Sequence, residues 1–193
     1  MDVGFVVDAS GIVGPNLKMM MKFVQKFITK AIFKMDKVRA SVTSFCATAK
    51  TDIKFNEHDS VDAFAAALEA IPLIGGNKVL GGALEVAADM FKPENGARPL
   101  VPKVMILLVV TDPQAKRRRR SVSDDPMAVA DKVRKMGINI IVVAVQLNIR
   151  YHGLGDLAGP DKNKNVFTVG DYEELVDDRT VNFVLKRAYE LSK

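Results

Sequence analysis

The chain has 193 residues, of which 48% are hydrophobic and 26% are charged, and these values are ordinary for a globular domain. They exclude a disordered chain and a fibrous repeat. A small disulfide-stabilised scaffold is excluded because the sequence holds a single cysteine, Cys46. The net charge of +5 indicates acidic partners, although the distribution of this charge matters more than its sum.

No membrane span and no signal peptide are visible in the sequence. The longest apolar run, Val104–Val110, has the length of a strand and is far shorter than the roughly 18 residues of a spanning helix. The chain begins in a predicted strand, as a mature domain without its signal peptide would. Cys46 lies in another strand-like run, so we expect a buried thiol. No membrane partner is expected.

Strand and helix patterns alternate from end to end. In chain order they predict a strand at Val3–Val7, a helix at Asn16–Phe33, a strand at Val38–Phe45, an edge strand at Thr51–Phe55, a helix capped by Ser60 that ends before Ile71, a helix at Leu80–Phe91, a strand at Val104–Val110, a helix at Pro126–Met136, a strand at Ile138–Val145, a helical turn at Tyr151–Leu157, a strand at Asn165–Val169 and a helix at Tyr172–Leu191.

This alternation predicts one doubly wound α/β domain over residues 1–193. The central sheet is mostly parallel with one antiparallel edge strand, Thr51–Phe55, and helices cover both faces. Val104–Val110 is continuously apolar, which is typical of a central parallel strand covered on both sides. In such folds the functional site lies at the carboxyl ends of the strands.

Two of these strand ends carry aspartates. Val3–Val7 leads directly into Asp8, and Val104–Val110 leads into Asp112 after one threonine. Both side chains are expected at the same edge of a parallel sheet. Each aspartate could simply cap or turn the chain. Together they could also contribute oxygen ligands to a hard cation such as Mg²⁺.

Five segments in the right order resemble the von Willebrand factor type A domain of collagens, matrilins and integrins. They cover nearly the whole chain and are Asp8–Asn16, Ile71–Leu84, Val109–Asp112, Gly137–Ala144 and Asn165–Leu175. The resemblance implies a metal-ion-dependent adhesion site built from five side chains on three loops. Asp8 and Ser10 match the first loop of that pattern, and Asp112 matches the third.

Two of the five ligand positions of this sequence depart from the family's pattern. Ile12 stands where a second serine is expected, and Lys78 stands at the threonine position. We therefore expect a degenerate site with no tightly bound cofactor. Our hypothesis is that the Lys78 ammonium replaces the metal between Asp8 and Asp112. The alternative is that Lys78 extends into solvent and the site is empty or binds Mg²⁺ or another divalent cation weakly.

A run of five consecutive positive charges follows Asp112. Such runs usually lie in solvated loops, but this one could also bind a polyanion such as a sulfated glycan. No aromatic residues interleave with it, so sequence-specific nucleic-acid binding is not expected. Outside the run, positive and negative charges balance at 23 each. The candidate partner-binding residues are Lys78, Lys116, Arg117, Arg118, Arg119 and Arg120.

The resemblance implies non-catalytic recognition of collagen or another matrix protein, through the loops Asp8–Pro15, Gly75–Leu80 and Asp112–Ser121. A structural role in matrix assembly, with the basic run binding polyanions or acidic proteins, is the second hypothesis. We expect no enzymatic activity, because no nucleophile pairs with a base in the sequence. The expected location is extracellular. An intracellular one stays open, since members of the fold also occur inside cells.

Overall fold

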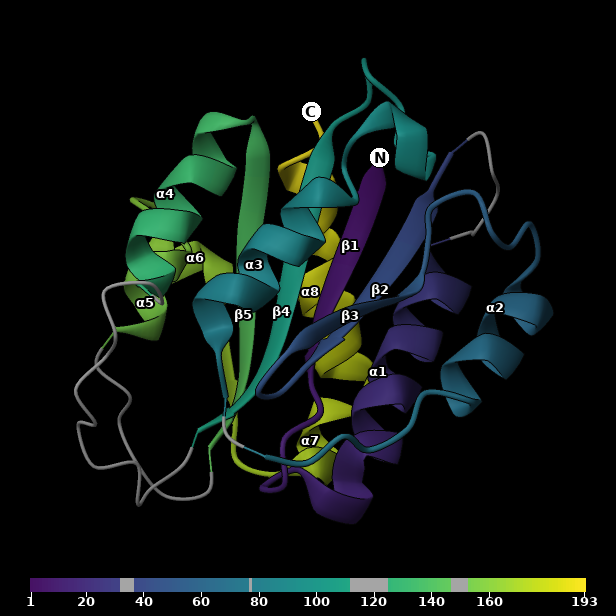
Figure 1. Cartoon of the computed structure of the whole chain (residues 1–193), viewed down its shortest axis with the longest axis vertical. Coiled ribbons are helices and arrows are strands. Elements are labelled where there is room, and N and C mark those ends of the chain that lie inside the picture. The colour runs from purple at the N-terminus through teal and green to yellow at the C-terminus, as the bar shows by residue number, and fades with distance from the viewer. Residues whose placement is uncertain (32–36, 77, 112–124, 147–152) are drawn as a thin grey trace.

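The computed structural model describes residues 1–31, 37–76, 78–111, 125–146 and 153–193 (Figure 1). In these residues, six strands form one sheet in the order β3-β2-β1-β4-β5-β6. Only the β2–β3 pair is antiparallel, which confirms the predicted doubly wound α/β fold with one antiparallel edge strand. The strands are β1 (Asp2–Asp8), β2 (Arg39–Phe45), β3 (Ala49–Ile53), β4 (Lys103–Thr111), β5 (Ile138–Gln146) and β6 (Val166–Val169).

Helices cover both faces of the sheet (Figure 1). The α1, α2, α7 and α8 helices pack on one face, and α3, α4 and α5 pack on the other, while α6 leads into β6. The helices are α1 (Leu17–Lys30), α2 (Val61–Glu69), α3 (Leu80–Asp89), α4 (Pro126–Lys135), α5 (Leu154–Leu157), α6 (Lys162–Asn165), α7 (Tyr172–Leu175) and α8 (Asp178–Glu190), with 3₁₀ turns η1 (Gly14–Asn16) and η2 (Pro93–Asn95).

The central strand β4 is buried on both sides, as its continuous apolar sequence predicts. Val104, Ile106 and Leu108 pack toward α1 and α8, whereas Met105 and Leu107 pack toward α3 and α4. All five side chains are fully buried. Alternation along each strand therefore fills two cores, one on each face of the sheet.

The predicted ends of several elements shift. The segment predicted as one closing helix forms two, α7 and α8, because Asp177 caps a new helix by accepting a hydrogen bond from Arg179 N at 2.7 Å. The α6 turn before β6 was not predicted, and β3 begins at Ala49 rather than Thr51. Ser60 caps α2 as predicted, since its Oγ accepts from Ala63 N at 3.2 Å. Cys46 is buried, which confirms that expectation.

None of the helices in the described ranges combines the length and the apolar character that crossing a membrane requires.

Candidate binding site at the carboxyl ends of the strands

Asp8 ends β1 at the carboxyl edge of the sheet, the lower edge in Figure 1. Its carboxylate is fully buried and accepts two backbone hydrogen bonds. Ser10 N donates to Oδ1 at 3.0 Å, and Val110 N donates to Oδ2 at 3.2 Å. Asp8 therefore shapes its own loop and ties the end of β1 to the end of the neighbouring strand β4.

Lys78 reaches the same carboxylate from the segment between α2 and α3. Its Nζ lies 2.5 Å from Asp8 Oδ2 and also donates to the carbonyl oxygen of Val110. The Lys78 side chain is 22% exposed, whereas that of Asp8 is inaccessible to solvent. The structure thus brings together two of the residues that the sequence singled out, as an ion pair whose anionic member is buried.

Backbone contacts position Lys78. Gly75 N donates to Ala9 O at 3.0 Å, and Val79 N donates to Cys46 O at 2.8 Å. Gly75 and Gly76 have φ angles of 73° and 93°, which glycine adopts without the strain imposed by a side chain. Three loops, those after β1, after β2 and before α3, therefore meet at the edge of the sheet and direct the lysine toward Asp8.

Two of the buried hydroxyl groups that have no hydrogen-bond partner among the described residues lie just beyond the ends of β1 and β6. One is Ser10 Oγ, two residues from Asp8 in the first loop. The other is Tyr172 Oη, at the start of α7. Burial raises the pKa of Tyr172 to about 12, and the negative charge of Asp8 adds to the shift. This phenol is therefore a neutral group held near a buried anion.

The described residues do not fit a divalent cation while Lys78 occupies this position. Ser10 Oγ is an unpaired oxygen that could serve as a ligand. However, both oxygens of Asp8 already have donors, one of them the ammonium. At ~4 Å a second unit positive charge would be repelled by about 4 kcal/mol at an effective dielectric near 20, and a divalent ion by about twice that. No group of three His, Cys, Asp or Glu side chains in the described ranges could hold a metal.

The other residues of the predicted site fall into two groups. Asp112 and the basic run Lys116–Arg120 lie outside the described residues. Ile12, which replaces a serine in the family's pattern, is 40% exposed at the surface of the first loop.

Sequence reasoning missed two apolar residues of this surface, Leu73 and Ile74, which are 47% and 40% exposed. They directly precede Gly75, whose N donates to Ala9 O, so they lie on a segment that is joined to the loop carrying Ile12. Two apolar residues between Pro72 and a pair of glycines, in a segment too short for a helix, were the available signal. We call Ile12, Leu73 and Ile74 the apolar rim.

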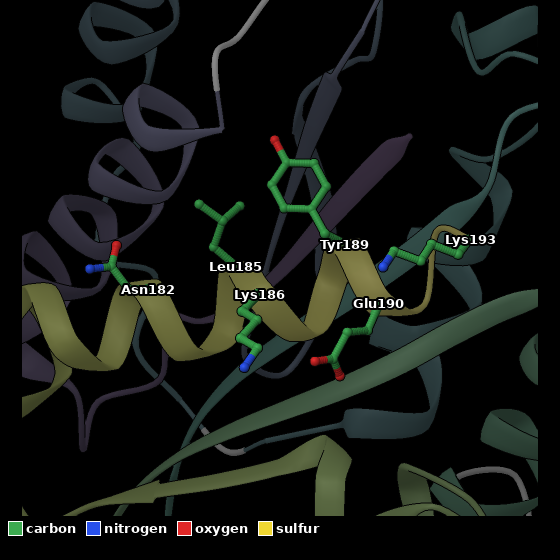
Figure 2. Close-up of a pocket in the computed structure, with 6 residues that line it drawn as sticks. All are labelled: Asn182, Leu185, Lys186, Tyr189, Glu190 and Lys193. Atoms are coloured by element: carbon green, nitrogen blue, oxygen red, sulfur yellow. The ribbon is translucent and has the colours of Figure 1, made fainter.

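A hollow on α8 is separate from these residues. It has a volume of about 370 Å³ and lies along one stripe of the helix (Figure 2). Its lining residues are Asn182, Leu185, Lys186, Tyr189, Glu190 and Lys193. It contains none of the predicted site residues.

Comparison with known proteins gives a family match and relatives among the collagens. Residues 2–179 match the von Willebrand factor type A domain family. The collagen alpha-6(VI) chain of Mus musculus is 34% identical over 175 residues, which cover 90% of this chain and 7% of that protein. The collagen alpha-1(XII) chain of Notophthalmus viridescens is 26% identical over 186 residues, 94% of this chain and 19% of that protein. The chain therefore spans only a small part of these relatives.

Solved structures agree on the fold. Crystal form 2 of proximal thread matrix protein 1 from the mussel byssus has a TM-score of 0.83 at 21% identity, covering 97% of this chain and 47% of that one. A structure of the same mussel protein has a zinc-occupied metal-ion-dependent adhesion site and aligns with a TM-score of 0.77 at 22% identity, covering 97% of this chain and 45% of that one. At these identities the likeness establishes the fold alone.

Proposed function

The chain belongs to the von Willebrand factor type A domain family, and on this premise we propose that it is a non-catalytic recognition domain of the extracellular matrix. It docks a matrix protein, collagen first among the candidates, on the loops at the carboxyl ends of the strands. The matrix collagens among its relatives support both the setting and the class of partner. Residues 1–193 act as one domain in this proposal.

The apolar rim is the observation that carries the proposal. Ile12, on the loop that follows Asp8, and Leu73 and Ile74, on the segment that carries Lys78, expose 40% or more of their surface. Exposed apolar side chains that gather on one surface are typical of protein-binding sites. The loops that carry them are joined by backbone hydrogen bonds, so docking there would require little ordering of the chain.

Two other residues, Cys46 and His58, support a function without catalysis. Cys46 is 2% exposed, so its thiol is withdrawn from any substrate. His58 Nε2 is buried and has no hydrogen-bond partner in the described part of the chain, so it activates no nucleophile there. We propose that any divalent cation, Mg²⁺ included, binds the protein weakly.

Binding to immobilised collagen, measured by surface plasmon resonance, tests this function. Replacing two of the three rim residues, in L73S/I74S, is expected to weaken binding at least about tenfold, which corresponds to about 1.4 kcal/mol. Leu100→Ser is the matched control, because Leu100 is 98% exposed and precedes β4 at the opposite edge of the sheet. Absence of binding by the wild type, or equal loss in both variants, would contradict the proposal.

A structural role in matrix assembly is the second candidate. Lys116–Arg120 contributes all of the net charge of the chain, and Asp112 with this run lies outside the described residues. Such a cluster would bind sulfated glycans with an affinity that falls steeply with ionic strength. We expect a variant in which all four arginines of Arg117–Arg120 are replaced by serine to elute from heparin at much lower salt than the wild type.

A second variant controls for net charge in that experiment. It replaces four exposed lysines elsewhere on the surface, Lys18, Lys22, Lys50 and Lys54. If the basic run is the binding element, this variant elutes close to the wild type. If both variants lose affinity equally, binding reflects net charge alone and the second candidate function fails.

A further inference from the structure

We propose that the Lys78 ammonium is the resident cation of this site, so that the protein recognises its partner without a divalent metal ion. The inference concerns the Asp8–Val110–Lys78 cluster. Only the part that concerns the partner rests on the proposed function, and the metal-binding part stands independently of it.

The cluster gives the ammonium an anionic and a neutral oxygen from two different strands. Asp8 Oδ2, at the end of β1, lies 2.5 Å from Nζ, and the Val110 carbonyl near the end of β4 accepts a second hydrogen bond. A carboxylate that is completely buried requires a counter-charge, and Lys78 is the cation that contacts it. The lysine therefore neutralises Asp8 in the way that a bound cation would.

The remaining contacts of Asp8 show that its position needs no metal. Oδ1 accepts from Ser10 N, and Oδ2 accepts from Val110 N in addition to the lysine. The backbone of the first loop and of β4 thus fixes the carboxylate before any ligand arrives. A divalent ion could bind Asp8 only after displacing the ammonium, which is part of the folded chain and present at high effective concentration.

Among the described residues, the contacts of the lysine leave one donor for a partner. An ammonium group has three N–H donors, and two of them contact Asp8 and Val110 within the described part of the chain. The side chain is 22% exposed, between loops that carry the apolar rim. The chemistry that fits is an oxygen acceptor, a carboxylate above all, flanked by apolar groups.

Titration of the full chain with MgCl₂ and MnCl₂ tests the metal-binding part, by calorimetry and by the thermal unfolding midpoint. The wild type is expected to shift by less than about 1 °C at millimolar cation. Lys78→Thr removes the ammonium and supplies the hydroxyl oxygen that the family's pattern has at this position. Its midpoint is expected to rise by about 5 °C or more once the cation exceeds its Kd about 100-fold.

Lys50→Thr is the matched control, because Lys50 is an exposed lysine paired with Asp52 outside the cluster. Micromolar binding of Mg²⁺ or Mn²⁺ by the wild type would overturn the inference. So would a Lys78→Thr protein that responds to the cations no more than Lys50→Thr does. The wild-type titration needs no variant, so it gives its result even where Lys78→Thr fails to fold.

Binding to immobilised collagen in EDTA and in MgCl₂ tests the partner part. The wild type is expected to bind equally in both, and Lys78→Met, which keeps the length of the side chain but loses its charge, is expected to lose at least about tenfold in affinity. Wild-type binding that EDTA abolishes would overturn the inference. Absence of collagen binding in both solutions would contradict only the proposed partner, since the cation titration gives its result separately.

Discussion

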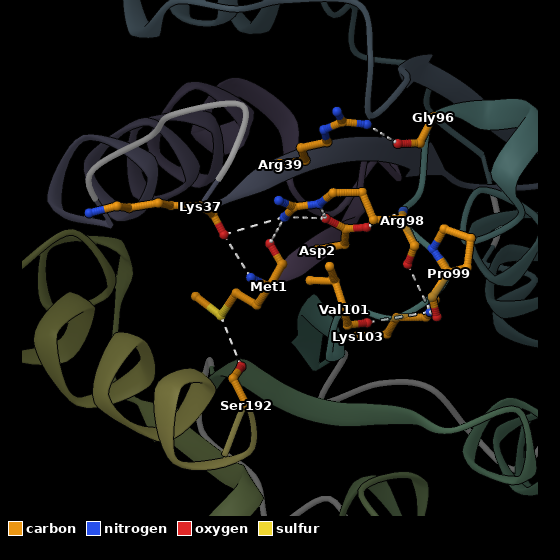
Figure 3. Close-up of polar contacts among 10 residues, drawn as sticks. All are labelled: Met1, Asp2, Lys37, Arg39, Gly96, Arg98, Pro99, Val101, Lys103 and Ser192. Carbon is orange, nitrogen blue, oxygen red and sulfur yellow. Dashed lines mark hydrogen bonds and ion pairs between the residues drawn. The ribbon is translucent and has the colours of Figure 1, made fainter.

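Arg98 binds both carboxylate oxygens of Asp2, which is completely buried at the amino edge of the sheet (Figure 3). Its backbone N donates to Oδ2 at 2.6 Å, while Nε and Nη2 donate to Oδ1 at 2.9 and 2.7 Å. Nη2 also reaches the carbonyl oxygens of Met1 and Lys37. One side chain thereby joins β1, the segment before β2 and the segment before β4.

Arg98→Ala is expected to lower the free energy of unfolding by about 3–5 kcal/mol, because it leaves a buried carboxylate without its cation. Chemical denaturation measures this change. Lys92→Ala is the control, since it removes only an exposed ion pair with Asp89 and should leave stability nearly unchanged. A loss from Arg98→Ala as small as that of the control would show that the Asp2 pair contributes little.

Gly4→Ala tests the close packing of β1 against the segment that follows α3. An added Cβ would lie 2.9 Å from the Phe91 ring, so the variant is expected to lose about 1–3 kcal/mol of stability. Gly82→Ala in α3 is the matched substitution, because its added Cβ would only touch Val79 at 3.7 Å. That variant should gain about 0.5–1 kcal/mol from helix propensity. Equal effects in the two variants would refute the packing argument.

The two described tyrosines, Tyr172 and Tyr189, should respond in opposite directions to replacement by phenylalanine. Tyr172 Oη is buried without a partner among the described residues, so Tyr172→Phe is expected to leave stability unchanged or raise it by about 1 kcal/mol. Tyr189 Oη donates to Ala31 O at 3.0 Å, so Tyr189→Phe should lower stability by about 0.5–1.5 kcal/mol. Thermal and urea unfolding of both variants measure these changes. A marked loss of stability in Tyr172→Phe would mean that the Tyr172 hydroxyl has a stabilising partner.

The same phenol predicts how stability depends on pH in alkaline solution. The pKa of Tyr172 is raised from 10.0 to about 12 by burial and by Asp8, so the folded state keeps this proton after the unfolded state has lost it. The contribution of this proton to stability is therefore fully present below pH 10.0 and is lost as the pH rises toward about 12, on the order of 2 kcal/mol in total. Unfolding measured across this range should show a shallower decline in Tyr172→Phe. Parallel curves for the two proteins would contradict the shift.

Much of the fold could be predicted because strand and helix periodicities are local. The apolar run Val104–Val110 predicted a strand buried on both faces, and β4 is that strand. Ser60 predicted the start of a helix, and its side chain caps α2. The prediction of a single closing helix was wrong, because the helix is interrupted at Val176 and Asp177, where the Asp177 side chain caps α8. An aspartate such as Asp177 can lie inside a helix or cap the start of one, and competition between these two conformations decides where the helix ends.

The candidate site was only partly readable from the sequence. The resemblance aligned Asp8, Ser10 and Lys78, but alignment gives no distances. The carbonyl and N–H of Val110 leave no trace in the sequence, since every residue has such groups. The exposure of Leu73 and Ile74 was equally hidden, because an apolar residue in a loop can face the core or the solvent.

By itself, then, the sequence determined the order of elements, the continuously apolar central strand and the confinement of the net charge to the run Lys116–Arg120. These are properties of neighbouring residues, and periodicity and charge can be counted along a chain. Only the tertiary structure decided that Lys78 turns inward to a buried Asp8 instead of extending into solvent. That choice depends on loops distant in sequence that meet at one edge of the sheet, where a carboxylate removed from water requires a cation beside it.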